Sequence, residues 1–188
     1  MEKVAIEQIV RDERDLQIDP ATSDHITYPE FVKYFADLEV IKLHNLIIGA
    51  NFTYGWMPTM LKFKSNDFGS SVAILNKAKH GDLITEAELV TLRDFINNSV
   101  VGTSKLLHFV APSVYAIWDS RVYRYINERD HYGDMIKPQN YFAYIENCTE
   151  LVQHRDFPRV HDSMKRKLGY SVSPLRSVEL VMHLKGGR

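Results

Sequence analysis

Cysteine is almost absent from the sequence: Cys148 is the single cysteine among 188 residues. One thiol excludes a disulfide within the chain, and it excludes a zinc or iron–sulfur centre held by several cysteines. We therefore expect no metal site, no iron–sulfur cluster and no other cofactor. A chain without disulfides suits a reducing compartment, so a cytoplasmic location is expected.

Long apolar runs and a strong net charge are missing as well. No stretch approaches the roughly 20 apolar residues of a membrane-spanning helix, and the charged first residues lack the apolar core of a signal peptide. We expect no membrane partner. The net charge is −1, so no overall field identifies a nucleic-acid-binding protein. From Leu151 to the end, however, eight lysine and arginine residues stand against three aspartate and glutamate residues. This local excess fits a surface that faces phosphate, and it fits a solvated helical face equally well.

Alternation of apolar and polar residues typical of strands is absent, and so are repeats and low-complexity tracts. Apolar residues recur at helical spacing, and at 45% of the chain they suffice for a sizeable core. The sequence therefore predicts an all-α, compact multi-helix protein with one domain spanning residues 1–188. Helices are expected over residues 2–16, 27–48, 68–78, 85–96, 103–110, 120–128, 138–151, 159–168 and from 174 onward.

Several of these helices carry recognisable capping residues at their ends. Thr27 with Glu30, and Thr85 with Glu88, have the spacing of a capping box. Gly169 is placed to end the helix over residues 159–168 in the left-handed conformation.

Most of the candidate functional residues lie in residues 98–129, NSVVGTSKLLHFVAPSVYAIWDSRVYRYINER. Gly102 supplies the backbone freedom of a tight turn, and Thr103 is expected to cap the helix that follows. Pro112 ends that helix because it lacks an N–H group and disfavours helical geometry at the residue before it. Asp119 then stands where a carboxylate accepts the free N–H groups of the next helix, which keeps it ionised and fixed in direction.

These residues resemble the helix-hairpin-helix/Gly-Pro-Asp superfamily of base-excision DNA glycosylases. The resemblance is centred on residues 85–130, which would form a helix-hairpin-helix-like element packed between N-terminal and C-terminal helices. Gly102 stands alone where the family's turn is richer in glycine. The matching residues are Val101 and Gly102 for the turn, Leu106, Leu107 and Phe109 for the helix face, Pro112, Tyr115 and Ile117 for the link, and Asp119, Val122 and Arg124 after it.

The resemblance implies a DNA-binding enzyme that cleaves the N-glycosidic bond of a damaged or modified base. Asp119 matches the family's essential carboxylate, which stabilises positive charge on the sugar. Lys105 lies close to the nucleophilic lysine of the bifunctional members, although its path to Asp119 is shorter by roughly one helical turn. Each residue also has a plainer interpretation: Asp119 as a helix cap alone, and Lys105 as a solvated or phosphate-contacting lysine.

Further candidates surround this pair of residues. Aromatic and imidazole side chains would line a base pocket, or would simply pack in the core. Backbone and basic groups would contact DNA phosphates, or would form solvated helix ends. The pocket candidates are Trp56, from an aromatic stretch over residues 49–64 that is expected to be irregular, with His108, Tyr115 and Trp118. The DNA-contact candidates are Gly102, Thr103, Ser104, Arg121, Arg124, Lys165, Arg166 and Lys167.

Two other classes of function remain open at this point. The first is a non-catalytic module of the same fold that binds nucleic acid or a protein partner. The second is an α-helical ribonuclease of a defence system, in which an arginine is followed by a histidine on one helix. Arg124 with His131, and Arg155 with His161, have that loose spacing, although Pro158 interrupts the helix of the second pair.

Overall fold

The computed structural model describes residues 2–57 and 59–187, and within them the chain forms eleven helices and no extended strand. The predicted all-α fold is therefore confirmed. The helices are α1 (Ile6–Arg14), α2 (Ser23–Ala36), α3 (Leu43–Gly55), α4 (Phe68–Lys79), α5 (Glu86–Phe95), α6 (Val100–Val110), α7 (Ser120–Asn127), α8 (Tyr132–Met135), α9 (Pro138–Gln153), α10 (Phe157–Leu168) and α11 (Pro174–Lys185).

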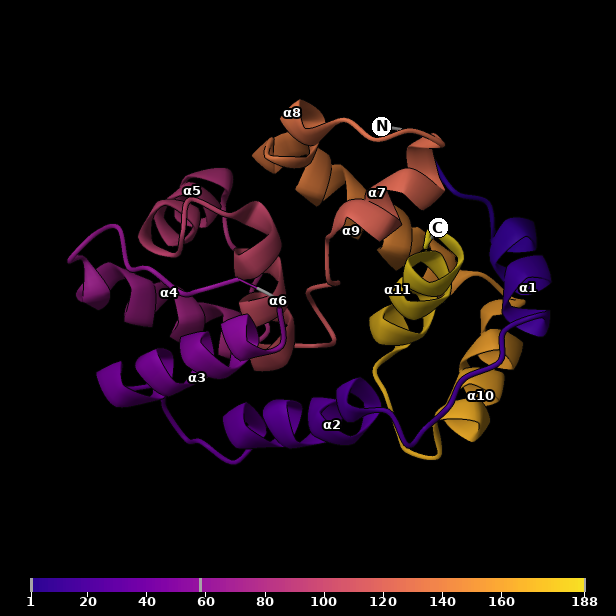
Figure 1. Ribbon diagram of the computed structural model, residues 1–188, viewed down its shortest axis with the longest axis horizontal. Helices are drawn as coiled ribbons and strands as arrows, with labels where there is room; N and C mark the ends of the chain where they lie inside the picture. The colour runs from indigo at the N-terminus through magenta and orange to yellow at the C-terminus, as the bar shows by residue number, and fades with distance from the viewer. Residues whose placement is uncertain (1, 58, 188) are drawn as a thin grey trace.

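The helices fall into two groups that lie side by side (Figure 1). The first helix group contains α2 to α6, with α6 packed against α2, α3, α4 and α5. The second helix group contains α7 to α11 together with α1, which packs against α10 and α11 although it comes first in the chain. The segment between α6 and α7 carries the chain from one group to the other.

In this connecting segment, residues 111–119, the second half (residues 115–119) is buried and fixed by hydrogen bonds from both groups. From α6, the Ser104 hydroxyl accepts from the N–H group of Trp118 at 3.0 Å, and its single proton is shared between the carbonyls of Val101 and Trp118, at 2.8 and 3.2 Å. From α9, the Tyr141 hydroxyl donates to the carbonyl of Ala116 at 3.1 Å, and the Tyr144 hydroxyl donates to that of Ile117 at 3.0 Å. Since a buried carbonyl needs a partner, these bonds define the path of the segment and the position of Asp119 at its end.

Most of the predicted helix ends are confirmed. Thr85 and Glu88 form the expected capping box at the start of α5. Helix α6 ends at Val110, two residues before Pro112. Gly169 ends α10 with φ of 78°, and Asp119 caps α7.

The helix predicted over residues 27–48 is wrong, because the structure has two helices with a break between them. Helix α2 begins at Ser23 rather than at Thr27, and it ends at Ala36. The break is held by Asn76 of α4, whose side chain accepts from the N–H group of Ile41 and donates to its carbonyl, both at 2.8 Å. Because Asn76 is distant in the sequence, the local pattern of apolar residues does not reveal this break.

The irregular segment predicted over residues 49–64 is also partly wrong. Helix α3 continues to Gly55, and Pro58 lies outside the described residues. Gly49 lies inside this helix, where a Cβ atom would lie 2.3 Å from the ring of Phe35. The glycine serves close packing of α3 against α2 and does not break the helix.

The predicted turn at Gly102 is wrong as well. Asn97 and Asn98 make the turn, with φ of 55° and 53°, which short polar side chains tolerate. Ser99, and not Thr103, caps the helix: its hydroxyl accepts from the N–H group of Gly102 at 3.0 Å. Gly102 thus lies inside α6, where a Cβ atom would stand 2.2 Å from the hydroxyl oxygen of Tyr54.

Replacing Gly102 with alanine is expected to lower the free energy of unfolding by about 1–3 kcal/mol, because the rigid ring of buried Tyr54 has to move. Gly55→Ala is the matched control, since a Cβ atom there meets nothing within 4 Å and alanine favours the helix. Urea unfolding of the two variants and of the unaltered protein measures the free energy of unfolding of each. Equal stability of Gly102→Ala and the unaltered protein would contradict the close packing.

Candidate functional site

Asp119 is held at the start of α7 by three hydrogen bonds. Its Oδ1 accepts from the N–H groups of Arg121 and Val122, both at 3.0 Å. Its Oδ2 accepts from Nδ1 of His183 on α11 at 2.8 Å. The residue is only 8% exposed, so the carboxylate is largely withdrawn from water and fixed in direction.

His183 links this carboxylate to a positive charge. Nη1 of Arg121 lies 3.3 Å from Nε2 of His183. Arginine only donates, so Nε2 accepts, and the imidazole proton is on Nδ1, facing Asp119. The hydrogen-bonded series Arg121, His183 and Asp119 therefore selects one tautomer of the imidazole.

Burial by itself would raise the pKa of Asp119. The hydrogen bond and electrostatic attraction from His183, the N–H group of Val122 and the charge of Lys105 outweigh that effect and lower the pKa of Asp119 to about 2. The carboxylate is therefore ionised throughout the neutral range.

Lys105 of α6 approaches from the first helix group. Its Nζ lies 5.1 Å from the centre of the Trp56 ring, in a cation–π contact. Burial lowers the pKa of Lys105, while the negative charges of Asp119 and Glu179 oppose that shift in part. Lys105 and Asp119 are close enough for each charge to change the pKa of the other.

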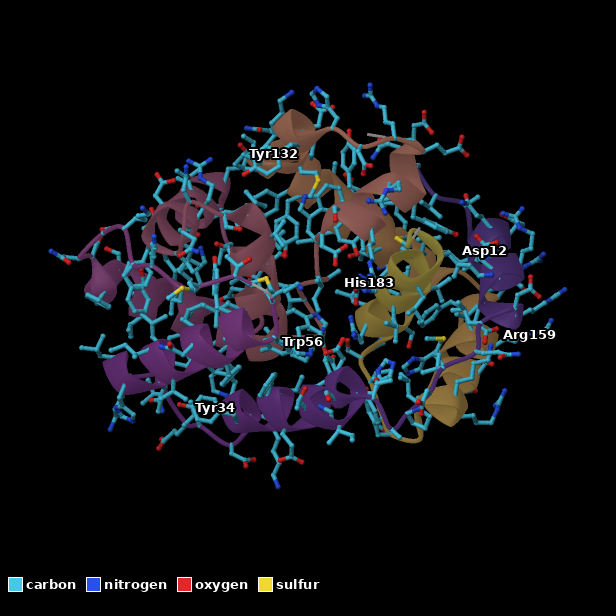
Figure 2. All side chains as sticks on the ribbon, in the orientation of Figure 1. Asp12, Tyr34, Trp56, Tyr132, Arg159 and His183 are labelled. Atoms are coloured by element: carbon cyan, nitrogen blue, oxygen red, sulfur yellow. The ribbon has the colours of Figure 1, made fainter. Side chains whose placement is uncertain are left out.

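A buried ion pair completes the site from α11. Nη1 of Arg176 bonds to Oε2 of Glu179, and the two side chains are 5% and 0% exposed. The guanidinium carbon lies 4.7 Å from the centre of the Tyr28 ring and 5.8 Å from that of the Trp56 ring. We call the six residues that meet between the helix groups the central cluster: Trp56, Lys105, Asp119, Arg176, Glu179 and His183. Figure 2 shows Trp56 and His183 facing the middle of the molecule from opposite groups.

Four polar atoms in and beside the central cluster are buried without a hydrogen-bond partner among the described residues. An unpaired buried polar atom costs roughly 1–3 kcal/mol, and native proteins keep few of them. Their concentration here indicates a site built to receive polar groups of a ligand or ordered water. The atoms are Nδ1 of His25, Nε1 of Trp56, Nε of Arg176 and Oε1 of Glu179.

The other predicted pocket residues lie in the core. His108 is fully buried: its Nδ1 donates to the carbonyl of Tyr115 at 2.6 Å, and its Nε2 accepts from the hydroxyl of Tyr28 at 2.8 Å. Burial and the charge of Arg176 lower the pKa of His108 to about 3, so its imidazole is neutral. Tyr115 and Trp118 have no exposed surface, and Nε1 of Trp118 donates to the carbonyl of Met135.

The predicted DNA-contact residues near Asp119 have different surroundings. Gly102, Thr103 and Ser104 are buried in α6, and the Gly102 N–H group is already bonded to Ser99. Arg121 is exposed beside His183. Arg124 pairs with Asp130 at 2.9 Å and also donates to the carbonyl of Gly186.

The basic triplet on α10 is remote from Asp119 in the chain and is largely engaged within the protein. Lys165 pairs with Asp162 at 2.8 Å, and Lys167 pairs with Glu13 of α1 at 2.6 Å. Arg166 is exposed. Together with the hydrogen bond and charge of Lys165, its charge lowers the pKa of Asp162.

The arginine–histidine pairs of the ribonuclease interpretation are not joined by a contact in the described part of the chain. His131 caps α8 and accepts from the N–H group of Asp134, away from the bonds of Arg124. His161 bonds to Ser177 of α11 at 2.8 Å, whereas the side chain of Arg155 is 90% exposed.

Three members of the central cluster, Arg176, Glu179 and His183, were not foreseen from the sequence. Their spacing of three and four residues places them along one face of α11, a helix whose other residues are mainly apolar. Polar residues at helical spacing within a buried helix are the signal that would have found them.

No group of three or more histidine, cysteine, aspartate or glutamate residues in the described chain is arranged to hold a metal ion. The helices of residues 2–57 and 59–187 include none that is long and apolar enough to cross a membrane. No protein-family model matches the chain, and no curated protein or solved structure matches it either.

The lowered pKa of Asp119 predicts a definite pH dependence of stability. The pKa is about 2 in the folded protein against 3.8 ordinarily, so the ionised carboxylate adds about 2 kcal/mol to the free energy of unfolding above pH 4. That contribution is lost as the pH falls from about 4 to 2. Asp119→Asn, which keeps a capping oxygen, lacks it at every pH.

Urea unfolding of both proteins between pH 2 and pH 7 tests this expectation. The difference in free energy of unfolding between the unaltered protein and Asp119→Asn should stay constant above pH 5 and shrink below pH 4. A difference that does not vary with pH would show that the carboxylate is not held in its ionised form.

Proposed function

We propose that this protein is a DNA glycosylase that removes a damaged or modified base by cleaving its N-glycosidic bond. The observation that carries the proposal is the opposition of Asp119, an ionised and oriented carboxylate, to Lys105, an amine whose pKa is lowered by burial. The two come from different helix groups, the charge of each changes the pKa of the other, and Nζ of Lys105 lies over the aromatic ring of Trp56.

Asp119 has the properties that departure of the base requires. As the bond between C1′ and the base nitrogen breaks, positive charge develops on the sugar, and a preorganised carboxylate stabilises it. His183 and the N–H groups of α7 hold Asp119 in place before the reaction, so no reorganisation is needed during it.

Lys105 supplies the nucleophile in this proposal. Its unprotonated Nζ attacks C1′ and forms a new C–N bond, while the base departs with the electrons of the glycosidic bond and takes up a proton. Opening of the sugar ring then gives an imine between Lys105 and C1′. Desolvation favours the free amine that this step needs.

The unpartnered atoms of the central cluster suit recognition of a flipped base. Nε1 of Trp56 and Nε of Arg176 are free donors, and Oε1 of Glu179 is a free acceptor. Nucleobase edges present both kinds of group, and the Trp56 face offers a stacking surface. Because Glu179 has no exposed surface, entry of a base requires the two helix groups to separate locally.

The alternative of a non-catalytic binding module shares all of this geometry. It differs in one respect: binding would survive loss of the Asp119 charge, and no base would be released from any substrate. Among the described residues no contact joins the arginine–histidine pairs on which the ribonuclease interpretation depends.

The proposal predicts a covalent intermediate that borohydride traps. Incubation with duplexes that each carry one oxidised, deaminated or alkylated base, or an abasic site, should give an adduct on at least one of them, because hydride reduces the imine to a stable amine. Lys105→Gln should abolish the adduct. Lys33→Gln, which alters an exposed lysine of α2, should leave it intact.

Asp119→Asn should slow base release on that substrate on the order of 100-fold or more, with the helices preserved by circular dichroism. Base release without an adduct would show that Lys105 is not the nucleophile. In that case a water molecule beside Asp119 would attack the sugar. A folded protein that releases no base from any duplex, but still binds DNA, would overturn the enzymatic proposal in favour of a binding module.

A further inference from the structure

A second charged site lies away from the central cluster, where α1 meets the start of α10. A cavity of about 460 Å³ opens there, and four arginines surround it. We call these residues, Arg11, Arg14, Arg155 and Arg159, the arginine hollow. Figure 2 shows Arg159 on α10, near the edge of the molecule and apart from His183.

The spacing of residues in the two helices explains why the arginines converge. Arg11 and Arg14 are three residues apart on α1 and therefore share one helix face. Arg159 lies in the first turn of α10 and Arg155 in the turn just before this helix, and both line the same cavity. Glu13 keeps the two helices together, because its Oε1 accepts from Ser163 and pairs with Lys167, both at 2.6 Å. The hollow is thus formed by fixed elements.

The charges around the hollow are incompletely balanced. Arg14 and Arg159 have no ion pair or hydrogen-bond partner for their side chains among the described residues, and Arg155 is 3.8 Å from Asp156 with 90% of its side chain exposed. Arg11 pairs with Asp12, which does not line the cavity. Against four arginines the lining contributes two carboxylates, Glu7 and Asp156. A concentrated positive charge therefore remains in a chain whose net charge is −1.

The start of α10 strengthens this field. The side chain of Asp156 makes no capping hydrogen bond to α10, and Pro158 occupies its first turn. A helix N-terminus carries partial positive charge, which favours an anion beside it. Guanidinium groups on both sides add paired N–H donors that match the oxygens of a phosphate.

We infer that the arginine hollow binds phosphate groups. Two sources present the same chemistry: the phosphodiesters of a nucleic-acid strand, and the phosphates of a free nucleotide. The inference does not rest on base cleavage, since it uses no residue of the central cluster.

The test compares two double variants that each lose two positive charges. Arg14→Gln with Arg159→Gln removes the unpaired arginines of the hollow. Arg93→Gln with Arg129→Gln, which alters arginines outside the hollow, is the matched control for net charge. Binding of labelled single-stranded and duplex 20-mers is followed by fluorescence anisotropy from 50 to 200 mM salt, and binding of inorganic pyrophosphate by calorimetry.

The hollow variant should bind the oligonucleotides more weakly, with a slope of log affinity against log salt that is smaller by about 1–2, while the control keeps both values. If Arg14→Gln with Arg159→Gln loses pyrophosphate binding and the control does not, the phosphates that the hollow binds are those of a free nucleotide. Equal losses in both variants would show a net-charge effect and overturn the site, and so would unchanged binding in both.

Discussion

The hydrogen bond between Asp119 and His183 is the interaction on which the central part of the structure depends. It joins the start of α7 to α11 at 2.8 Å, and the same carboxylate supplies the cap for α7. The buried connecting segment that leads to Asp119 is bound by hydroxyl groups of α6 and α9. One carboxylate thus ends the link between the helix groups, begins a helix and carries the main negative charge that faces Lys105.

The central cluster has a thermodynamic cost that the rest of the fold has to offset. Arg176 and Glu179 form a buried ion pair, and such a pair adds little net stability because both charges lose their hydration. Polar atoms without partners add further cost. The large aromatic core on either side, including Phe109, Trp118 and Tyr144, supplies the compensating burial. Such an arrangement is typical of a site shaped by function at some expense of stability.

The sequence predicted those features whose cause is local. The Asp119 cap, the helix end before Pro112 and the left-handed Gly169 were foreseen because a few neighbouring residues determine each one. The features that were missed depend on distant residues: Asn76 clamps the break between α2 and α3, and Gly102 serves packing against Tyr54. His183 was missed as a partner of Asp119 for the same reason, since it is 64 residues away.

The position of α1 has a consequence for how the chain acquires its structure. Val4 exchanges hydrogen bonds with the Asn147 side chain, and Lys3 pairs with Glu150, so the first residues belong to an assembly made by the last third of the chain. During synthesis α2 to α6 are complete before α7 to α11, so the first helix group can associate before the second. The second helix group cannot be completed until α11 has been synthesised. Because Asp119 bonds to His183 of α11, the central cluster cannot be completed before that helix has been synthesised.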